Sequence, residues 1–171
     1  MTGTKRRIVS SAHLVSDRAA ELSEYEFGVI VASNAFNRWI VRCMTAAGVP
    51  DLSPMDVLVL HGVNHRGRGK RLTDLCLVYG VEDQHLVSYS LKKLLRLKLV
   101  ARTRQGKEAL FAATEEGRAV CARYREVRED CLVEGLSALG QLDPADLAAT
   151  ARLLRALSGV YDQAARSATV L

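Results

Sequence analysis

The feature that most constrains the fold of this 171-residue chain is an ordered series of patterns between residues 72 and 117. Residues 72–78 are compatible with a short helix, and Tyr79-Gly80-Val81 with a turn in which glycine accepts a positive φ. Residues 82–99 are compatible with a second helix, which a basic, alternating stretch at residues 100–114 follows. This order leaves few topologies open, and the rest of the chain has to be arranged around it.

The second of these helices has one apolar and one basic face. The apolar stripe, which we expect to face the core, consists of Val87, Leu91, Leu94 and Leu95. A carboxylate at Glu82 or Asp83 can cap the start of the helix. The other side offers donors, cations and an aromatic edge to a major groove. The residues predicted to contact nucleic acid there are Gln84, His85, Ser88, Tyr89, Lys92, Lys93 and Arg96. An amphipathic helix with a merely solvated basic face would show the same pattern.

The stretch after this helix favours the nucleic-acid interpretation because it predicts a basic hairpin. Gln105 and Gly106 form the expected turn, and residues 109–113 return as an apolar strand. Cations would then gather near the tip, where they can meet phosphates or a minor groove. The residues predicted to make such contacts are Arg102, Arg104, Gln105 and Lys107. Two helices and a basic hairpin in this order are typical of a winged helix-turn-helix.

Positive charge is concentrated on the same segment. Residues 64–107 contain 11 Lys and Arg against 3 Asp and Glu, whereas the whole chain carries +5. Such a cluster suits a surface that displaces counterions from a polyanion. An acidic membrane would attract it too, but no long apolar span or basic amphipathic anchor accompanies it, so no membrane partner is expected.

The sequence does not point to an enzyme or a cofactor. His61 and His65 are four residues apart, but no third ligand of suitable spacing follows, so we expect no metal. A glycine-rich phosphate loop and a nucleophile with an evident base are also missing. The four cysteines, Cys43, Cys76, Cys121 and Cys131, form no CxxC pair and are expected to be reduced core residues, with a redox-sensing thiol as the open alternative.

The flanking sequence predicts further helices. Residues 22–47 are apolar on most of the helix circumference, which requires burial on more than one side. A long charged helix is expected from residue 114 to 139, and Asp143-Pro144 starts a last helix that ends near residue 165. The apolar stripe of that helix contains Leu147, Leu153, Leu154, Leu157 and Tyr161. A two-fold dimer would bury these surfaces, and a self-contained helical core is the alternative.

Several local motifs resemble those of the MarR family of winged helix-turn-helix transcription regulators, over roughly residues 22–165. The matching motifs are Ser53-Pro54 through Leu60, Thr73-Asp74-Leu75-Cys76 with Gly80-Val81, Leu94 with Leu99-Val100 and Arg102, and Ala113-Thr114-Glu115-Glu116-Gly117. The chain departs from the family pattern at Lys98, where glycine is usual, and in a shorter wing that lacks aspartate-x-arginine.

The resemblance implies that small ligands often bind between the dimer and DNA-binding regions. The residues that could border such a cleft are Trp39, Cys43, His61 and Tyr124, although core packing is the simpler use of each. The effector is unknown, and no pocket is predicted.

We therefore expect a mainly α fold with a small β-hairpin wing, a winged helix-turn-helix flanked by N- and C-terminal dimerisation helices. Residues 1–21 would be an N-terminal extension or arm, and residues 22–171 one MarR-like unit. Within it, residues 52–117 would be the DNA-binding part, and residues 22–47 and 118–165 the dimerisation helices. The expected function is a homodimeric, sequence-specific regulator of duplex DNA. Residues 1–16 lack the apolar region of a secretory signal, so a cytoplasmic location is expected. The alternative is a winged-helix module that binds an acidic protein.

Overall fold

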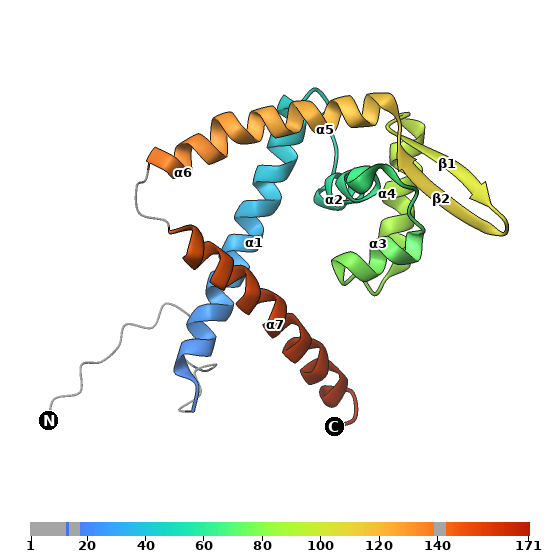
Figure 1. Ribbon diagram of the computed structural model, residues 1–171. Coiled ribbons are helices and arrows are strands. Elements are labelled where there is room, and N and C mark those ends of the chain that lie inside the picture. The colour runs from blue at the N-terminus through green and yellow to red at the C-terminus, as the bar shows by residue number, and fades with distance from the viewer. Residues whose placement is uncertain (1–12, 14–17, 139–142) are drawn as a thin grey trace, which may run out of the picture. The chain divides into compact units, whose positions relative to one another are not determined.

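The computed structural model describes residues 13, 18–138 and 143–171 (Figure 1). The chain divides into two compact units, one that ends at Val127 and one that begins at Arg128. The elements that begin in the first unit are α1 (Ala20–Ala46), α2 (Pro54–Asn64), the short 3-10 turn η2 (His65–Gly67), α3 (Leu72–Tyr79), α4 (Gln84–Arg96), β1 (Val100–Gln105), β2 (Glu108–Ala113) and α5 (Glu115–Arg128). Those of the second unit are the π-helical turn η3 (Glu129–Val133), α6 (Glu134–Ala138) and α7 (Pro144–Ala168). The mainly helical fold with one hairpin confirms the expected fold class. Most of the predicted arm, residues 1–12 and 14–17, lies outside the described residues.

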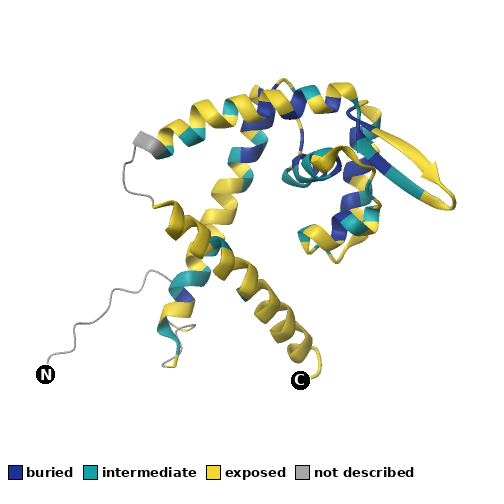
Figure 2. Ribbon diagram, viewed as in Figure 1, coloured by how far each residue is buried: buried dark blue, intermediate teal, exposed yellow. Residues whose placement is uncertain are grey.

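One hydrophobic core holds the first unit together. Figure 2 shows its buried residues in α2, in the α3 and α4 pair, and in the C-terminal half of α1. The largest fully buried side chains include Ile40, Met44, Leu60, Leu91 and Leu94. α1 contributes to this core through its C-terminal half, and in its N-terminal half Leu22, Phe27, Ile30 and Val31 are exposed.

The helix-turn-helix begins and ends close to where the sequence placed it. Gly80 closes α3 in the left-handed conformation, with φ of 62°. The carboxylate of Asp83 then accepts a hydrogen bond from the amide of His85 at 2.9 Å and caps α4. Helix α4 is shorter than the predicted 82–99, because this cap starts it at Gln84 and Lys98 adopts a left-handed φ of 58° after its end. Lys98 stands where the family usually has glycine, and its positive φ is one that strains a residue with a side chain.

The wing is an antiparallel hairpin that is paired on both sides of β2. Gln105 pairs with Glu108, so the turn residues are Gly106 and Lys107, one position later than predicted. Gly106, the first residue of the turn, has φ of 60°, a conformation that favours glycine. On the other side, Lys70 and Phe111 exchange two backbone hydrogen bonds of 2.8 and 2.9 Å. The basic segment between η2 and α3 is thus hydrogen-bonded to the wing through Lys70.

The start of α5 explains why the wing ends on threonine and, three residues later, glycine. The Thr114 hydroxyl accepts from the amide of Gly117 at 3.0 Å and donates to the carbonyl of Lys98 at 2.8 Å. The backbone of Gly117 also lies against that of Leu99, so closely that a Cβ would come within 2.0 Å of the Leu99 carbonyl oxygen. Only glycine fits at this position.

The single helix predicted for residues 114–139 is interrupted. At η3 the amide of Glu134 bonds to the carbonyl of Glu129, five residues earlier, and α6 continues from there to Ala138. The charge pattern of this segment predicted an uninterrupted helix and did not indicate the π-helical turn.

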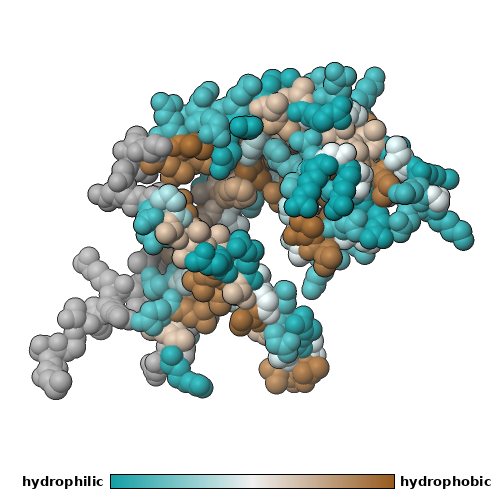
Figure 3. All heavy atoms as spheres, in the orientation of Figure 1, coloured by the Kyte–Doolittle hydropathy of each residue, from teal (hydrophilic) through white to brown (hydrophobic). Residues whose placement is uncertain are grey.

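Helix α7 begins as predicted. The Asp143 carboxylate accepts from the amide of Ala145 at 2.8 Å, and Pro144 occupies the first turn. No residue of α7 is buried in the described structure, and its apolar side chains form exposed surface along the helix (Figure 3). Among the described residues, no helix is long and apolar enough to cross a membrane.

Replacing Gly117 by alanine tests the close approach at the start of α5. The added Cβ would force the Leu99 carbonyl away from Thr114, so the free energy of unfolding should fall by about 2–4 kcal/mol. Urea unfolding followed by circular dichroism measures this change. Gly135→Ala is the matched control, because a Cβ at Gly135 meets nothing within 4 Å and alanine favours a helix. An unchanged stability of Gly117→Ala would contradict the assignment.

Candidate nucleic-acid interface

Helix α4 turns its apolar stripe inward and its basic side outward. Val87, Leu91 and Leu94 are buried, and Leu95 is half-buried. The predicted contact residues that lie exposed are Gln84, His85, Tyr89, Lys92 and Arg96, while Ser88 and Lys93 are half-buried. Four residues line a hollow of about 250 Å³ on this side: Tyr89, Lys92, Lys93 and Arg96. We call His85, Tyr89, Lys92 and Arg96 the outer face of α4. It combines an aromatic ring with cations, which is suitable for base edges and phosphates.

Lys93 differs from the other predicted contacts because it already has partners inside the protein. Its Nζ lies 2.9 Å from the Asp56 carboxylate and also donates to the Asp51 carbonyl. The Asp56 side chain is only 5% exposed and the Lys93 side chain 25%. This pair ties the last turn of α4 to the start of α2, so Lys93 helps to position the outer face whether or not it contacts a nucleic acid. Sequence periodicity missed the pair because its members are 37 residues apart.

The environment of Asp56 favours the charged form of its carboxyl. Burial alone would raise the pKa, but hydrogen bonds from Lys93, from the Ser53 amide and from Ser90 together lower it below the usual value. The amide of Ser53 donates to Asp56 at 2.8 Å, while the Ser53 hydroxyl accepts from the Asp56 amide at 3.2 Å. This reciprocal cap explains why a Ser-Pro pair starts α2.

The side of α4 that faces solvent also includes an apolar residue that sequence reasoning did not select. Leu86 is 53% exposed, whereas its neighbour Val87 is fully buried. Leu86 lies three residues before Tyr89, a helical neighbour that we had assigned to the contact set. That spacing is the signal in the sequence that places Leu86 beside the predicted contact residues.

The predicted wing residues are all exposed. Arg102 and Arg104 are two residues apart on β1, so they project from the same face of the hairpin. Gln105 and Lys107 flank Gly106 at the tip, and both are exposed. The hairpin therefore presents three cations and an amide, as the sequence predicted, although nothing in the structure tests their contacts.

Arg71 connects the base of the wing to the helix-turn-helix. Its guanidinium lies 2.9 Å from Asp74 in α3 and 3.2 Å from Glu108 in β2. Hydrogen bonds and the charges of these two carboxylates raise the pKa of Arg71, so it remains charged. All three side chains are exposed, so salt will screen this link.

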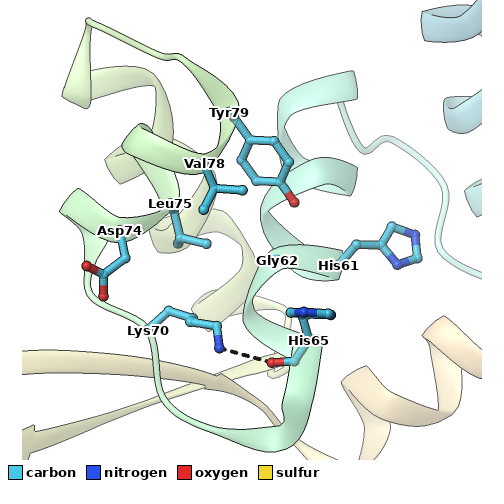
Figure 4. Close-up of a pocket in the computed structure, with 8 residues that line it drawn as sticks. All are labelled: His61, Gly62, His65, Lys70, Asp74, Leu75, Val78 and Tyr79. Atoms are coloured by element: carbon cyan, nitrogen blue, oxygen red, sulfur yellow. Dashed lines mark hydrogen bonds between the residues drawn. The ribbon is translucent and has the colours of Figure 1, made fainter. Parts of the chain in front are cut away.

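A pocket of about 380 Å³ lies between α2, η2 and α3 (Figure 4). Leu75, Val78 and Tyr79 form one wall, and the Tyr79 hydroxyl donates to the Leu58 carbonyl at 2.7 Å. On the opposite wall, Lys70 Nζ donates to the carbonyl of His65 at 3.0 Å. The pocket combines apolar and cationic groups inside the segment that carries the helix-turn-helix.

His61 also borders this pocket, but in Figure 4 its ring turns away from Tyr79 and Leu75. The ring packs edge to face on Tyr124, with 4.5 Å between the centroids. Its Nε2 is buried and has no hydrogen-bond partner among the described residues, and burial lowers the pKa of the ring, which keeps it neutral.

Two further residues of the cleft considered from sequence pack in the core. Cys43 and Tyr124 are buried, and Cys43 Sγ donates to the Tyr124 carbonyl at 3.5 Å. Cys76 and Cys121 are also buried, and burial raises the pKa of Cys121 to about 11. Cys131 was expected in the core but is exposed, and it lies in η3, which contains no buried residue. Within residues 13, 18–138 and 143–171, no three His, Cys, Asp or Glu side chains form a possible metal site.

Comparison with known proteins identifies the central segment. Residues 52–117 match the family described as winged helix DNA-binding domain, so this part of the chain is similar to such domains. No curated protein sequence matches the chain.

Solved structures extend the likeness to the flanking helices. A variant of MarR from E. coli complexed with operator DNA has 18% identity and a TM-score of 0.65, covering 83% of this chain and 99% of that one. CouR from Rhodococcus jostii RHA1, bound to p-coumaroyl-CoA, has 16% identity and a TM-score of 0.62, covering 80% and 92%. BpsR from Bordetella bronchiseptica has 25% identity and a TM-score of 0.55, covering 78% and 98%. The chain has the fold of the MarR family of regulators, which confirms the resemblance seen in its sequence.

Replacing Asp56 by alanine should destabilise the domain at neutral pH. Lys93 would lose its counterion and the Ser53 amide its acceptor, at a cost of about 2–3 kcal/mol in the free energy of unfolding. Because the pKa of Asp56 is lower in the folded than in the unfolded state, its contribution is complete above the ordinary value of 3.8 and disappears as the pH falls through the folded value.

Urea unfolding at pH 7 and at pH values below 3.8 checks this expectation. The difference between parent and variant should shrink in acid. Asp162→Ala, at an exposed position of α7, is the control and should change stability little at either pH. A difference that grows as the pH falls would show that Asp56 does not act as a charged partner.

Proposed function

We propose that this protein is a sequence-specific transcription regulator that binds duplex DNA as a homodimer and responds to a small ligand. The observation that carries the proposal is the outer face of α4, an exposed row of His85, Tyr89, Lys92 and Arg96 on a helix whose other side is buried in a winged helix domain. A recognition helix in a major groove needs this division of its surface.

The outer face of α4 and the cations of the wing would have separate roles in such a complex. His85 and Tyr89 are near the start of α4 and would meet base edges, with Gln84 and Ser88 beside them, whereas Lys92 and Arg96 lie further along and would meet phosphates. The wing cations Arg102, Arg104 and Lys107 would bind the neighbouring backbone or minor groove. The E. coli MarR structure that this fold resembles was solved with operator DNA, which favours the same use here.

Exposed apolar surface on the flanking helices supports a homodimer. Five large side chains of α1, between Leu22 and Phe36, are 38–59% exposed: Leu22, Phe27, Ile30, Val31 and Phe36. On α7, the exposed ones include Leu147, Leu153, Leu154 and Val160. Helices of this length with so much apolar surface normally bury it against another chain. A second copy would also supply a second outer face of α4 for a symmetric site.

Control by a small ligand is supported by the pocket between α2 and α3 and by two relatives. CouR was solved with p-coumaroyl-CoA, and 6-hydroxynicotinic acid regulates DNA binding by BpsR. A ligand that favoured one spacing of the two recognition helices would change the affinity for DNA. The proposal also implies a cytoplasmic location and a non-enzymatic role, since a regulator has to share a compartment with its DNA and acts by binding.

Selection of binding sites from random duplex DNA tests this function. The parent should enrich a symmetric sequence with half-sites about one helical turn apart, and its affinity should fall steeply with salt. Lys92→Ala and Arg96→Ala should each weaken binding by about 1–3 kcal/mol and reduce the salt dependence, since each removes a cation from the outer face.

Arg125→Ala is the matched control, because Arg125 is exposed on α5 and lies outside the two proposed surfaces. Binding by the Lys92 and Arg96 variants that equals the parent's would refute the assigned face. If the parent prefers an acidic protein to any duplex, the interaction-module alternative replaces the proposal.

Sedimentation equilibrium tests the dimer. The parent should sediment with twice the 18.7 kDa mass of one chain at micromolar concentration. Ile30→Glu and Leu154→Glu should shift it toward the single-chain mass, because each would bury a charge in the interface. Leu77→Glu is the control, since Leu77 is an exposed leucine on α3. A parent that stays monomeric would exclude a stable dimer.

A further inference from the structure

Two large side chains with substantial apolar surface lie on the solvent-exposed side of α4, which also carries Lys92 and Arg96. Leu86 is 53% exposed and Tyr89 is 77% exposed. Because they are three residues apart on a helix, their side chains are neighbours. Charged phosphates and the polar atoms of base edges offer no apolar partner to the leucine, so a complex made only of polar contacts would leave it without a favourable contact.

The direction of Leu86 is fixed by the packing on the other side of the helix. Val87 and Leu91 are buried in the core, and the Lys93 ion pair with Asp56 holds α4 against rotation. Asp83 caps the first turn, so α4 does not fray where Leu86 stands. Leu86 is therefore held on the exterior of a rigid first turn.

The first turn of a recognition helix is the part that approaches base edges, while later turns lie nearer the backbone. Leu86 is the third residue of α4, and the cations Lys92 and Arg96 come about two and about three turns later. With those cations on phosphates, Leu86 and the ring of Tyr89 would face the floor of the groove. The only apolar group that unmodified DNA presents there is the C5-methyl of thymine.

We propose that Leu86, together with the ring of Tyr89, contacts thymine methyl groups in the major groove. Each half-site then has to contain an A·T pair, in one orientation, beneath the first turn of α4. This inference rests on the proposed function and adds to it a residue that sets specificity. It assigns a base preference to a position that charge patterning could not reveal.

Replacing thymine by deoxyuridine tests the inference directly, because base pairing is kept and only the methyl group is removed. In duplexes carrying the selected site, the substitution is made at one position of both half-sites at a time. The parent should lose about three- to tenfold in affinity at one or two positions and show no change at the others.

Variants identify the residue that senses the methyl group. Leu86→Ala should bind the thymine duplex more weakly than the parent and should no longer distinguish thymine from deoxyuridine at the sensitive position. Tyr89→Phe should keep the distinction, because it keeps the ring, and Tyr89→Ala should reduce it. Leu77→Ala is the matched control, since Leu77 is 83% exposed on α3 and should leave the distinction intact. Thermal unfolding of each variant shows that the fold is retained.

The outcomes separate this inference from the function on which it rests. Equal affinity of the parent for thymine and deoxyuridine duplexes at every position overturns the inference while sequence-specific binding stands. A full methyl dependence in Leu86→Ala overturns the assignment to this residue. If Leu86→Ala and Leu77→Ala abolish binding to a protein partner and leave duplex binding unchanged, the exposed leucines form a protein-docking patch instead. Absence of any specific duplex binding by the parent refutes the proposed function itself.

Discussion

The candidate interface depends on the orientation of α4 about its own axis, because this orientation decides which side chains face solvent. Val87, Leu91 and Leu94 are buried, and their burial determines which side chains can point outward. The ion pair between Lys93 and Asp56 adds a polar restraint to this apolar one. Apolar packing is not directional, whereas Lys93 Nζ has to stay within reach of two fixed partners, the Asp56 carboxylate and the Asp51 carbonyl. The precision of the outer face therefore comes from both.

The parts that the sequence predicted well are those fixed by local chemistry. Gly80, Asp83 and Asp143 end or begin helices through interactions with neighbours in the chain, and each acts as expected. The hairpin was also predicted, but its turn was placed one residue early. The pairing of Gln105 with Glu108 requires glycine at the first turn position, and an alternating pattern of basic residues does not define that register.

Features that depend on distant partners were not predictable in the same way. Lys93 looked like one of several outward cations, and only the packing of α2 against α4 brings Asp56 to it. No role was predicted for Leu86, and the structure shows that it is exposed while its neighbour Val87 is buried. The contact residues of the wing and of α4 remain predictions, since exposure shows where a side chain is available and not what it binds.

The pairing of β2 on both sides has a consequence for how the hairpin behaves in a crowded solution. β1 covers one edge of β2, and Lys70 pairs with the other edge at Phe111, whereas within the described residues no strand pairs with the outer edge of β1. An open edge is a template on which other strands can add and aggregate. Arg102 and Arg104 stand on that strand, and like charges would repel a second hairpin brought alongside. The same arginines that would attract a polyanion thus also oppose edge-to-edge association of two hairpins. Replacing them by neutral residues would weaken both the attraction to a polyanion and the repulsion between hairpins.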